Sequence, residues 1–276
     1  MTKTIARRRC TARILVSAIA ACATAPVGAQ ATMVPTHTIA VLSLVGDQMD
    51  IVNQVVQTGH LLEANGHQFV DIQAAGVDIA ALRAAKGVFA RLDPTADVAL
   101  LTASRSEWYS AQEGLFDGGR ARLPAELDAA LRREHAGQLV LITKYRAETK
   151  IQAYDTKMGS GKVAGLGFYV DFHSRMRDVD TNETSRGYIS PFAYVRLTLI
   201  DTATGNVLRD TTRTETNMIM GKGDEADRNP WEVLSAQRKL DELRELLGAA
   251  VEGGLPQLFA PAAPAAPAAP VAGPAR

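Results

Sequence analysis

Two adjoining segments of alternating apolar and polar residues constrain the fold of this chain more than any other feature. Residues 192–200 and 206–214 are separated by Asp-Thr-Ala-Thr-Gly, in which Gly205 supplies the positive φ that a tight turn requires. Every second residue from Val195 to Leu199 is aliphatic, and the residues between them, Arg196 and Thr198, are polar. The pattern predicts an antiparallel hairpin with one face in the core and the other in water or covered.

Further strands and helices are expected around this hairpin. Gly46 and Asp47 form a turn signal between the first two apolar runs, which predicts a second hairpin there. Strands are predicted over residues 38–45, 49–56, 97–102, 138–145, 151–156 and 166–172, and helices over residues 77–92, 123–135 and 231–251. The expected fold is α/β (α+β): a mixed, largely antiparallel sheet with hairpins, packed by two or three helices in a single domain.

The first thirty residues are typical of an export signal. Residues 2–13 carry five cations and no acid, and the apolar stretch 14–25 that follows is shorter than the roughly 20 residues that span a bilayer. Small residues before the expected cut place signal cleavage after Ala29, with Ala31 as a second possible position. The alternative is a lipoprotein signal, because residues 19–22 resemble a lipobox that would make Cys22 the lipid-bearing N-terminus.

These boundaries divide the chain into four parts. We expect a signal peptide over residues 1–29, a short linker over 30–37, a single α/β domain over 38–255, and an Ala/Pro-rich disordered tail over 256–276. The tail repeats Ala-Ala-Pro, and proline at every third position favours extended polyproline II over a packed core.

Charge and cysteine usage narrow the classes of function. The whole chain has 30 basic and 30 acidic residues, but five of the basic residues lie in the leader, so the remainder carries a net charge of about −5. This negative net charge disfavours binding to nucleic acid or to an anionic membrane. Both cysteines, Cys10 and Cys22, also lie in the leader. Cleavage after Ala29 would therefore leave no thiol for a disulfide, a thiolate metal site or a nucleophile.

The order of the predicted elements resembles that of a group of envelope proteins. Residues 138–146 read Q-L-V-L-I-T-K-Y-R, and residues 197–208 form a strand, an Asp-Thr-x-Thr-Gly turn and a second strand. Together these segments are similar to the small α/β domains of Gram-negative envelope lipoproteins, of the curli-secretion, penicillin-binding-protein-activator and TolB N-terminal type. Residues 163–171 also resemble uncharacterised exported proteins of Gram-negative bacteria. The resemblance implies a domain that binds other envelope proteins and is not an enzyme.

Glycine-rich motifs give no signature of a nucleotide site. Residues 158–163 read M-G-S-G-K-V and suggest a phosphate loop, but Thr156 stands at the first glycine position and Val163 at the Ser/Thr position. The run from Gly159 to Ala164 fails as a dinucleotide fingerprint because a strand, not a helix, is expected after it. We therefore expect a solvated hairpin turn here and no cofactor.

Scattered titratable residues give no signature of a catalytic or metal site either. No pair among the five histidines has the spacing that places two imidazoles on one metal; the five are His37, His60, His67, His135 and His173. Asp171 and His173 are the nearest approach to a ligand pair, with Asp178 and Asp180 close by in a polar segment, 175–186, that is expected to be an exposed loop. No G-x-S-x-G elbow nominates a serine nucleophile.

The sequence thus favours an exported, non-catalytic periplasmic protein. It would bind an unidentified envelope protein or polymer through a sheet edge, or through the segments 159–163 and 175–186. If Cys22 is modified, the protein would instead be held at the outer membrane by a lipid anchor. The alternative function is a periplasmic hydrolase or metal-dependent enzyme with a dispersed site, which would bring Asp171 and His173 together with Asp178 or Asp180.

Overall fold

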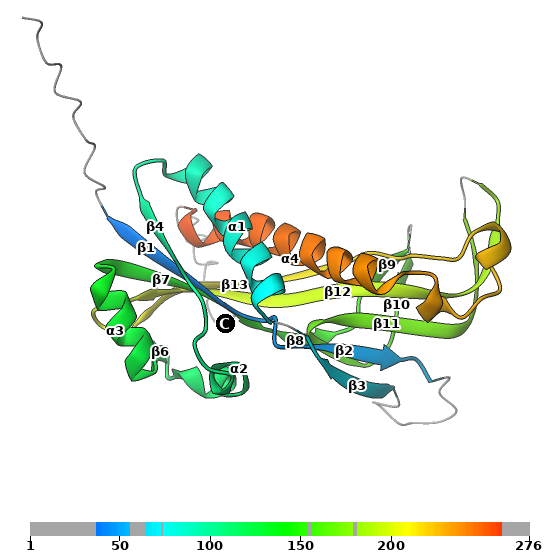
Figure 1. Ribbon diagram of the computed structural model, residues 1–276, viewed down its shortest axis with the longest axis horizontal. Coiled ribbons are helices and arrows are strands. Elements are labelled where there is room, and N and C mark those ends of the chain that lie inside the picture. Colours follow the sequence, from blue (N-terminus) through cyan, green and yellow to red (C-terminus); the bar gives the residue numbers. More distant parts are fainter. Residues whose placement is uncertain (1–36, 56–64, 73, 154–155, 179–180, 261–276) are drawn as a thin grey trace, which may run out of the picture. The chain divides into compact units, whose positions relative to one another are not determined.

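A computed structural model describes residues 37–55, 65–72, 74–153, 156–178 and 181–260. The expected cleavage site Ala29 and the alternative lipidation site Cys22 lie outside these residues. The main sheet has nine strands, and two pairs of helices lie on its two faces (Figure 1). The fold class expected from the sequence, a mixed and largely antiparallel sheet packed by helices in one domain, is confirmed.

The long strand β12 (Thr184–Asp201) organises the sheet. Two strands lie end to end along one of its edges: β11 (Lys162–Arg177) pairs with its first part and β7 (Ala136–Lys144) with its last part, both antiparallel. Lys144 is opposite Val195 and Gly165 is opposite Tyr194, so β11 continues the line of β7 after the insertion of residues 145–164. β13 (Val207–Thr216) pairs with the other edge of β12.

β1 (Thr38–Leu44) and β2 (Gln48–Asn53) are also arranged end to end, beside β7 and β11. β1 runs parallel to β7, and β2 runs parallel to β11. Outside them lie β4 (Asp97–Leu101), parallel to β1, and β3 (Gly66–Asp71), antiparallel to β2. The sheet order is therefore β3-β2-β11-β12-β7-β1-β4, with β13 paired to β12 and β8 (Arg146–Glu148) to β11.

The hairpin predicted from the first two apolar runs is wrong. β1 and β2 are not paired with each other, because the chain does not reverse at Gly46 and Asp47 but makes a short jog and continues in the same direction. The jog lies beside the end of β7, where Lys144 Nζ is 2.7 Å from Asp47 Oδ1. A turn signal in the sequence marks an irregularity in the backbone, but partners elsewhere decide whether the chain turns back.

Two long helices cover one face of the sheet. α1 (Ala74–Leu92) and α4 (Ala236–Phe259) pack on the aliphatic side of the strands (Figure 1), and Val195, Leu197 and Leu199 are buried in this core as their alternation predicts. The helix expected over residues 231–251 begins later and ends later. Asn229 caps only a 3-10 turn, Pro230–Glu232, and Ser235 caps α4 itself, which includes Pro256.

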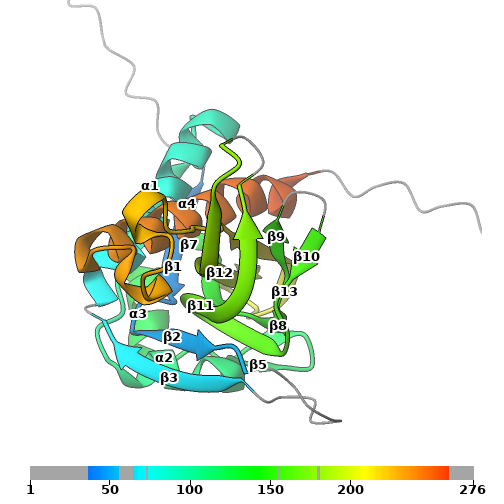
Figure 2. The same ribbon diagram turned by 90° about the vertical axis from the view of Figure 1, so that its right-hand side faces the viewer.

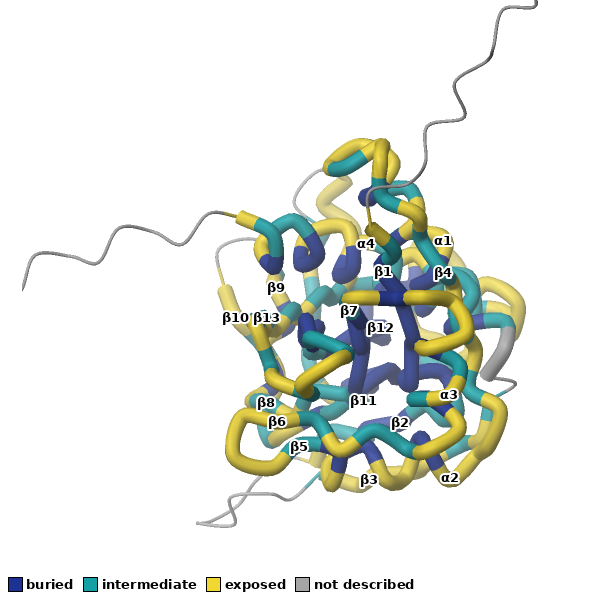
Figure 3. The backbone as a smooth tube through the Cα atoms, turned by 90° about the vertical axis from the view of Figure 1, so that its left-hand side faces the viewer, coloured by how far each residue is buried: buried dark blue, intermediate teal, exposed yellow. Residues whose placement is uncertain are grey.

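The opposite face is covered in two separate pieces. α2 (Glu107–Ser110) and α3 (Ala125–Arg133), with the small hairpin of β5 (Phe116–Asp117) and β6 (Arg120–Ala121), pack over β7, β1 and β4. The insertion between β7 and β11, which contains β8 and the hairpin of β9 (Ile151–Ala153) and β10 (Thr156–Met158), packs over the other half. Because both faces of the sheet are covered, the strands β1, β7 and β12 are buried along much of their length (Figure 3).

Two further expectations about loops have opposite outcomes. The hairpin turn between β12 and β13 forms as predicted, with Gly205 at φ 72°. Residues 175–186, expected to be an exposed polar loop, instead belong mostly to the ends of β11 and β12, which pair from Arg175 opposite Arg186 to Arg177 opposite Thr184. The polar side chains of this segment therefore lie on a long hairpin.

Candidate functional site

The sequence-predicted pair of Asp171 and His173 does not form a ligand site. Asp171 is fully buried at a bulge in β11, and its Oδ1 accepts hydrogen bonds from the backbone N–H groups of His173 (2.7 Å) and Ser174 (2.9 Å). The His173 side chain is exposed. Asp178 pairs with Lys222 at 3.4 Å, and Asp180 lies outside the described residues. The carboxylate of Asp171 is therefore engaged in closing its own bulge.

A polar crevice lies at the carboxyl ends of the parallel strands β1 and β4, where α/β sheets often bind ligands. Its most buried acid is Asp78 in α1, which is 4% exposed. Asp78 Oδ1 accepts from the backbone N–H groups of Val45 and Gly46 at 3.2 Å each, and Oδ2 accepts from the Tyr109 hydroxyl at 2.7 Å.

The carboxylate of Asp78 is engaged by hydrogen bonds from groups within the protein. Ser43 Oγ also donates to its Oδ1 at 2.5 Å, so four donors surround the carboxylate. Burial raises the pKa of Asp78, while the hydrogen bonds from Ser43 and Tyr109 act to lower it. Asp78 therefore pairs the backbone groups that the jog between β1 and β2 would otherwise leave without partners.

More generally, no three His, Cys, Asp or Glu side chains within the described ranges gather closely enough to hold a metal ion. The glycine-rich segment after β10 leads into strand β11 and not into a helix, as the sequence predicts, and its Gly159 and Gly161 both have positive φ. Asn65, just before β3, donates to the Ser160 carbonyl at 2.6 Å. Among these same residues, no helix combines the length and the apolar character needed to span a bilayer.

β3 is an edge strand of the main sheet. β3 pairs only with β2, and Figure 2 shows it outside that strand. The Ile72 amide donates to the Asp47 carbonyl at 2.9 Å, which makes this the first hydrogen-bonded pair of the ladder. Because hydrogen-bonded and non-hydrogen-bonded pairs alternate in antiparallel strands, residues 66, 68 and 70 bond to β2. The N–H and C=O groups of His67, Phe69 and Asp71 therefore point outward.

β3 is firmly attached on its inner side. Asp50 in β2 is 4% exposed, and its Oδ2 lies 2.8 Å from Nδ1 of His67 in β3. Burial raises the pKa of Asp50, and the hydrogen bond and the nearby charge of His67 act in the opposite direction. This contact and the backbone ladder hold β3 in register, so its outer edge is a positioned row of donors and acceptors.

Apolar surface flanks this edge on both faces. On the face opposite the helices, the Phe69 side chain is 64% exposed, the largest value among the exposed large hydrophobic residues. On the helix face lies a groove of about 430 Å³, lined mainly by Met49, Ile51, Val70, Val170, Phe172 and Trp231. A strand added beside β3 could place alternate side chains against Phe69 and toward this groove.

Little in the amino-acid sequence marks this edge strand. β3 reads G-H-Q-F-V-D, which has only two large apolar residues and no clear alternation, so no strand was expected there. An edge strand with exposed side chains need not carry the apolar pattern on which strand prediction depends. The one available signal was general: the expectation that a sheet edge would serve as a binding surface.

Comparisons with known proteins show no family for this chain. No protein-family model matches the sequence, and no curated protein matches it. Its structure is similar to that of the PelC dodecamer from Paraburkholderia phytofirmans, with 14% identity over 80% of this chain and 86% of that one and a TM-score of 0.30. A putative neuraminyllactose-binding hemagglutinin homolog from Helicobacter pylori has 9% identity, covers 79% of each chain and has a TM-score of 0.32. Neither name belongs to the envelope families that the sequence resembles. Structural similarities with TM-scores this low carry no argument about the function of this chain.

Proposed function

We propose that this chain is an exported, non-catalytic protein of the bacterial cell envelope that binds an extended segment of another envelope protein along the outer edge of β3. The single observation that carries this proposal is the row of outward backbone groups at His67, Phe69 and Asp71, with no strand beside it among the described residues. Extended peptides add to exposed sheet edges through such groups, and pockets for alternate side chains give specificity.

The absence of protection on β3 supports this proposal. Soluble proteins usually blunt edge strands with lysine, proline or inward charges, because an open edge pairs with other chains. β3 contains no lysine, arginine or proline, and it exposes Phe69 beside an apolar groove. An edge of this composition is a liability unless a partner covers it.

Export is supported by the sequence of the leader. The five cations and the short apolar stretch that precede Ala29 are typical of a signal removed during secretion. The non-catalytic part of the proposal is supported by two of the buried acids, Asp78 and Asp171, whose oxygens accept hydrogen bonds from nearby backbone N–H groups.

Photo-crosslinking in the native host tests the binding edge. A photo-reactive amino acid replaces Gln68, whose side chain lines the groove beside β3, and the same amino acid replaces Leu208 on the opposite edge strand β13 as a control. We expect a discrete adduct with a second protein from position 68 and none from position 208. Adduct formation from both positions, or from neither, contradicts the proposal, and an adduct of twice the chain mass would replace the partner by a second copy.

A matched pair of substitutions then isolates the backbone. Phe69→Pro removes an outward N–H without removing a hydrogen bond to β2, whereas Phe69→Thr removes the same aromatic ring and keeps the N–H. We expect the adduct from position 68 to be lost with proline and to persist, weakened, with threonine. Persistence of the adduct with proline would show that the partner does not add a strand.

The mature N-terminus tests export and anchoring. Mass spectrometry of the protein from envelope fractions should show a chain that begins at Gln30. A lipid-modified chain beginning at Cys22 would make it an outer-membrane lipoprotein instead, and an intact chain that keeps Met1 in the cytosol would contradict export.

A further inference from the structure

Methionine side chains gather in one groove on the sheet face opposite α1 and α4. Four of the five methionines in the described part of the chain line this groove of about 460 Å³, namely Met158, Met176, Met218 and Met220. All four are partly buried and pack against the same aromatic cluster, which includes Tyr169, Tyr188 and Phe192. The fifth, Met49, lies in the separate groove beside β3.

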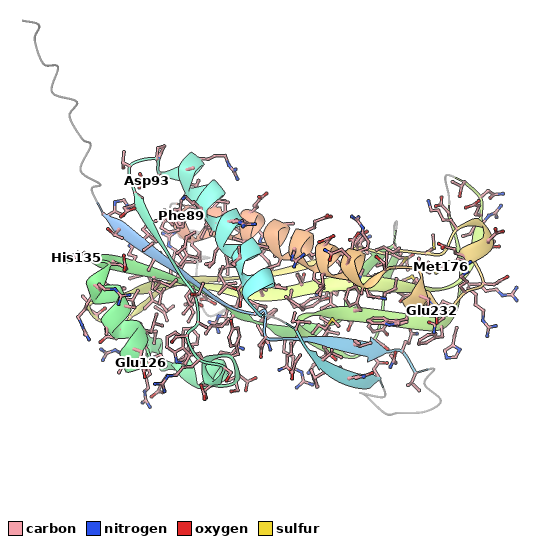
Figure 4. All side chains as sticks on the ribbon, in the orientation of Figure 1. Phe89, Asp93, Glu126, His135, Met176 and Glu232 are labelled. Carbon is pink, nitrogen blue, oxygen red and sulfur yellow. The ribbon has the colours of Figure 1, made fainter. Side chains whose placement is uncertain are left out.

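The four residues come from three segments of the chain. Met158 is the last residue of β10, and Met176 lies near the end of β11, close to the tip of the β11–β12 hairpin (Figure 4). Met218 and Met220 follow β13 in a segment that continues beside β12, and they lie on either side of Ile219.

Backbone pairing orients the Met218 and Met220 pair. Ile219 exchanges two hydrogen bonds with Ile189 of β12, with N···O distances of 2.9 and 3.0 Å, and its side chain packs into the core under the helices. Because successive side chains of an extended segment point to opposite faces, Met218 and Met220 both point to the other face, where they join the methionine groove. The spacing Met-Ile-Met thus delivers two thioethers to one side.

We propose that this groove, called here the methionine groove, binds one Cu(I) ion through thioether sulfurs, with Met218 and Met220 as ligands completed by Met158 or Met176. Thioethers are soft ligands that select Cu(I) over harder divalent ions. The remaining lining residues supply amide, hydroxyl, carboxylate and guanidinium groups but no imidazole or thiol, and they are Gln152, Ala153, Thr156, Arg177, Asp178 and Asn217.

The rest of the chain is compatible with such a site. From Gln30 onward the chain has no cysteine, so no thiolate of its own would compete for a soft cation. Thioethers do not form disulfides, so a methionine site remains available where thiols are oxidised. The residues that line this groove are different from those that line the groove beside β3, so the metal site does not depend on the proposed binding edge.

Competition for Cu(I) against bicinchoninate, with ascorbate present, tests the site. The full chain is used with Cys10→Ser and Cys22→Ser in every sample, so that leader thiols cannot bind the metal. We expect one Cu(I) per chain. Losing an outer partner of a metal ligand already costs about 10-fold to 100-fold in metal affinity. Combined Met218→Leu and Met220→Leu should therefore weaken Cu(I) binding at least about 100-fold.

The leucine substitutions also separate the metal from the alternative, an apolar ligand in the same groove. Leucine keeps the volume and the apolar character of methionine and usually costs less than about 1.5 kcal/mol, so the double variant should remain folded by circular dichroism. Met49→Leu is the matched control, and it should bind Cu(I) like the parent. The proposal is overturned if the parent does not compete for Cu(I), if the double variant binds as tightly as the parent, or if Met49→Leu loses the metal.

Discussion

β3 and β13 are two edge strands of the main sheet, and their surroundings differ. β13 reads V-L-R-D-T-T-R-T-E-T and carries four charged residues, and its arginines reach over to the C-terminal part of α4. Arg213 donates to the Gly253 carbonyl at 2.6 Å, Arg209 donates to the Ala260 carbonyl, and Thr211 bonds to Gln257 at 2.9 Å. β3 has six residues against ten in β13, has no basic residue other than His67, and contacts no helix in this way among the described residues.

This difference shows how an edge can be closed or kept available. Charges along β13 and the helix above it oppose the addition of another strand, which is a common protection against aggregation. β3 is fixed in place by its inner neighbour and left open outside, which is the arrangement that a strand-binding surface requires. The following predictions test whether β3 is a rigid, available edge and β13 a closed one.

The largest effect on stability is expected from Asp78, which contacts the jog between β1 and β2. Asp78→Ala would leave the Val45 and Gly46 amides and two hydroxyl groups buried without their acceptor. Each unsatisfied buried group costs about 1–3 kcal/mol, so we expect a loss of more than about 3 kcal/mol in the free energy of unfolding, measured by urea denaturation. A loss below about 1 kcal/mol would mean that the jog, and with it the direction of β2 and β3, does not depend on Asp78.

The next effect concerns the attachment of the β2–β3 pair to the sheet. Gly167 in β11 lies opposite Asp50 in β2, and a Cβ added there would lie 1.9 Å from the Asp50 carbonyl oxygen and 2.6 Å from Cζ of Phe192. Overpacking of this kind costs about 1–3 kcal/mol and sometimes more. Gly167→Ala should therefore destabilise the protein by about 2–3 kcal/mol.

Hydrogen exchange distinguishes local from global damage in that variant. Because the added Cβ meets the backbone of β2, protection should fall first in β2 and β3, while the β13 edge keeps its protection. Gly137→Ala is a matched control in β7, since an added Cβ there meets no atom within 4 Å. Equal loss of protection at both edges would show that β3 is not held separately from β13.

Local elements of this fold could be predicted because their signals are local. The apolar runs at β1, β4 and β7 and the helical spacing of α1 depend only on residues that are near in sequence, and the turn before β13 is specified by Gly205. The path of the sheet could not be predicted in the same way. Gly46 and Asp47 are compatible with a reversal or with a jog, and Asp78, more than thirty residues away, provides the contacts that define the jog.

The type of binding surface could be predicted from the sequence, but its location could not. A sheet edge was expected to bind a partner, but neither β3 nor its outward residues could be identified from a segment with little apolar character. The spacing of Asp171 and His173 suggested ligands, yet a bulge that needs an acceptor for two amides uses the same residue type. Methionines at 158, 176, 218 and 220 are far apart in sequence, so only the pairing of strands shows that they share a groove.

A smaller effect is expected from the charge of Asp78. Its pKa is raised in the folded protein by burial, so the folded state binds the proton more tightly than the unfolded state. The stabilisation from the protonated form is complete below the ordinary pKa of 3.8 and is lost as the pH rises through the raised pKa. Parent stability should therefore fall, relative to Asp78→Asn, between pH 4 and neutral pH.

Urea denaturation across that pH range measures the Asp78 contribution. The parent should lose stability relative to Asp78→Asn as the pH rises, because burial disfavours the ionised carboxylate. Asp50→Asn provides the comparison at the open edge, since its pKa is raised by burial as well. A parent whose stability relative to Asp78→Asn increases toward neutral pH would contradict the assigned direction.

The smallest effect compares the two edges directly. Phe69 on β3 is 64% exposed and Leu208 on β13 is 46% exposed, so threonine at either position removes apolar surface that already faces water. Surface substitutions of this kind usually change stability by less than about 0.5 kcal/mol. We expect Phe69→Thr and Leu208→Thr to unfold at nearly the parental urea concentration, and only Phe69→Thr to weaken the crosslink from position 68. A loss of more than about 1 kcal/mol for Phe69→Thr alone would mean that its ring packs within the protein, and the β3 edge would then be closed by its own side chain.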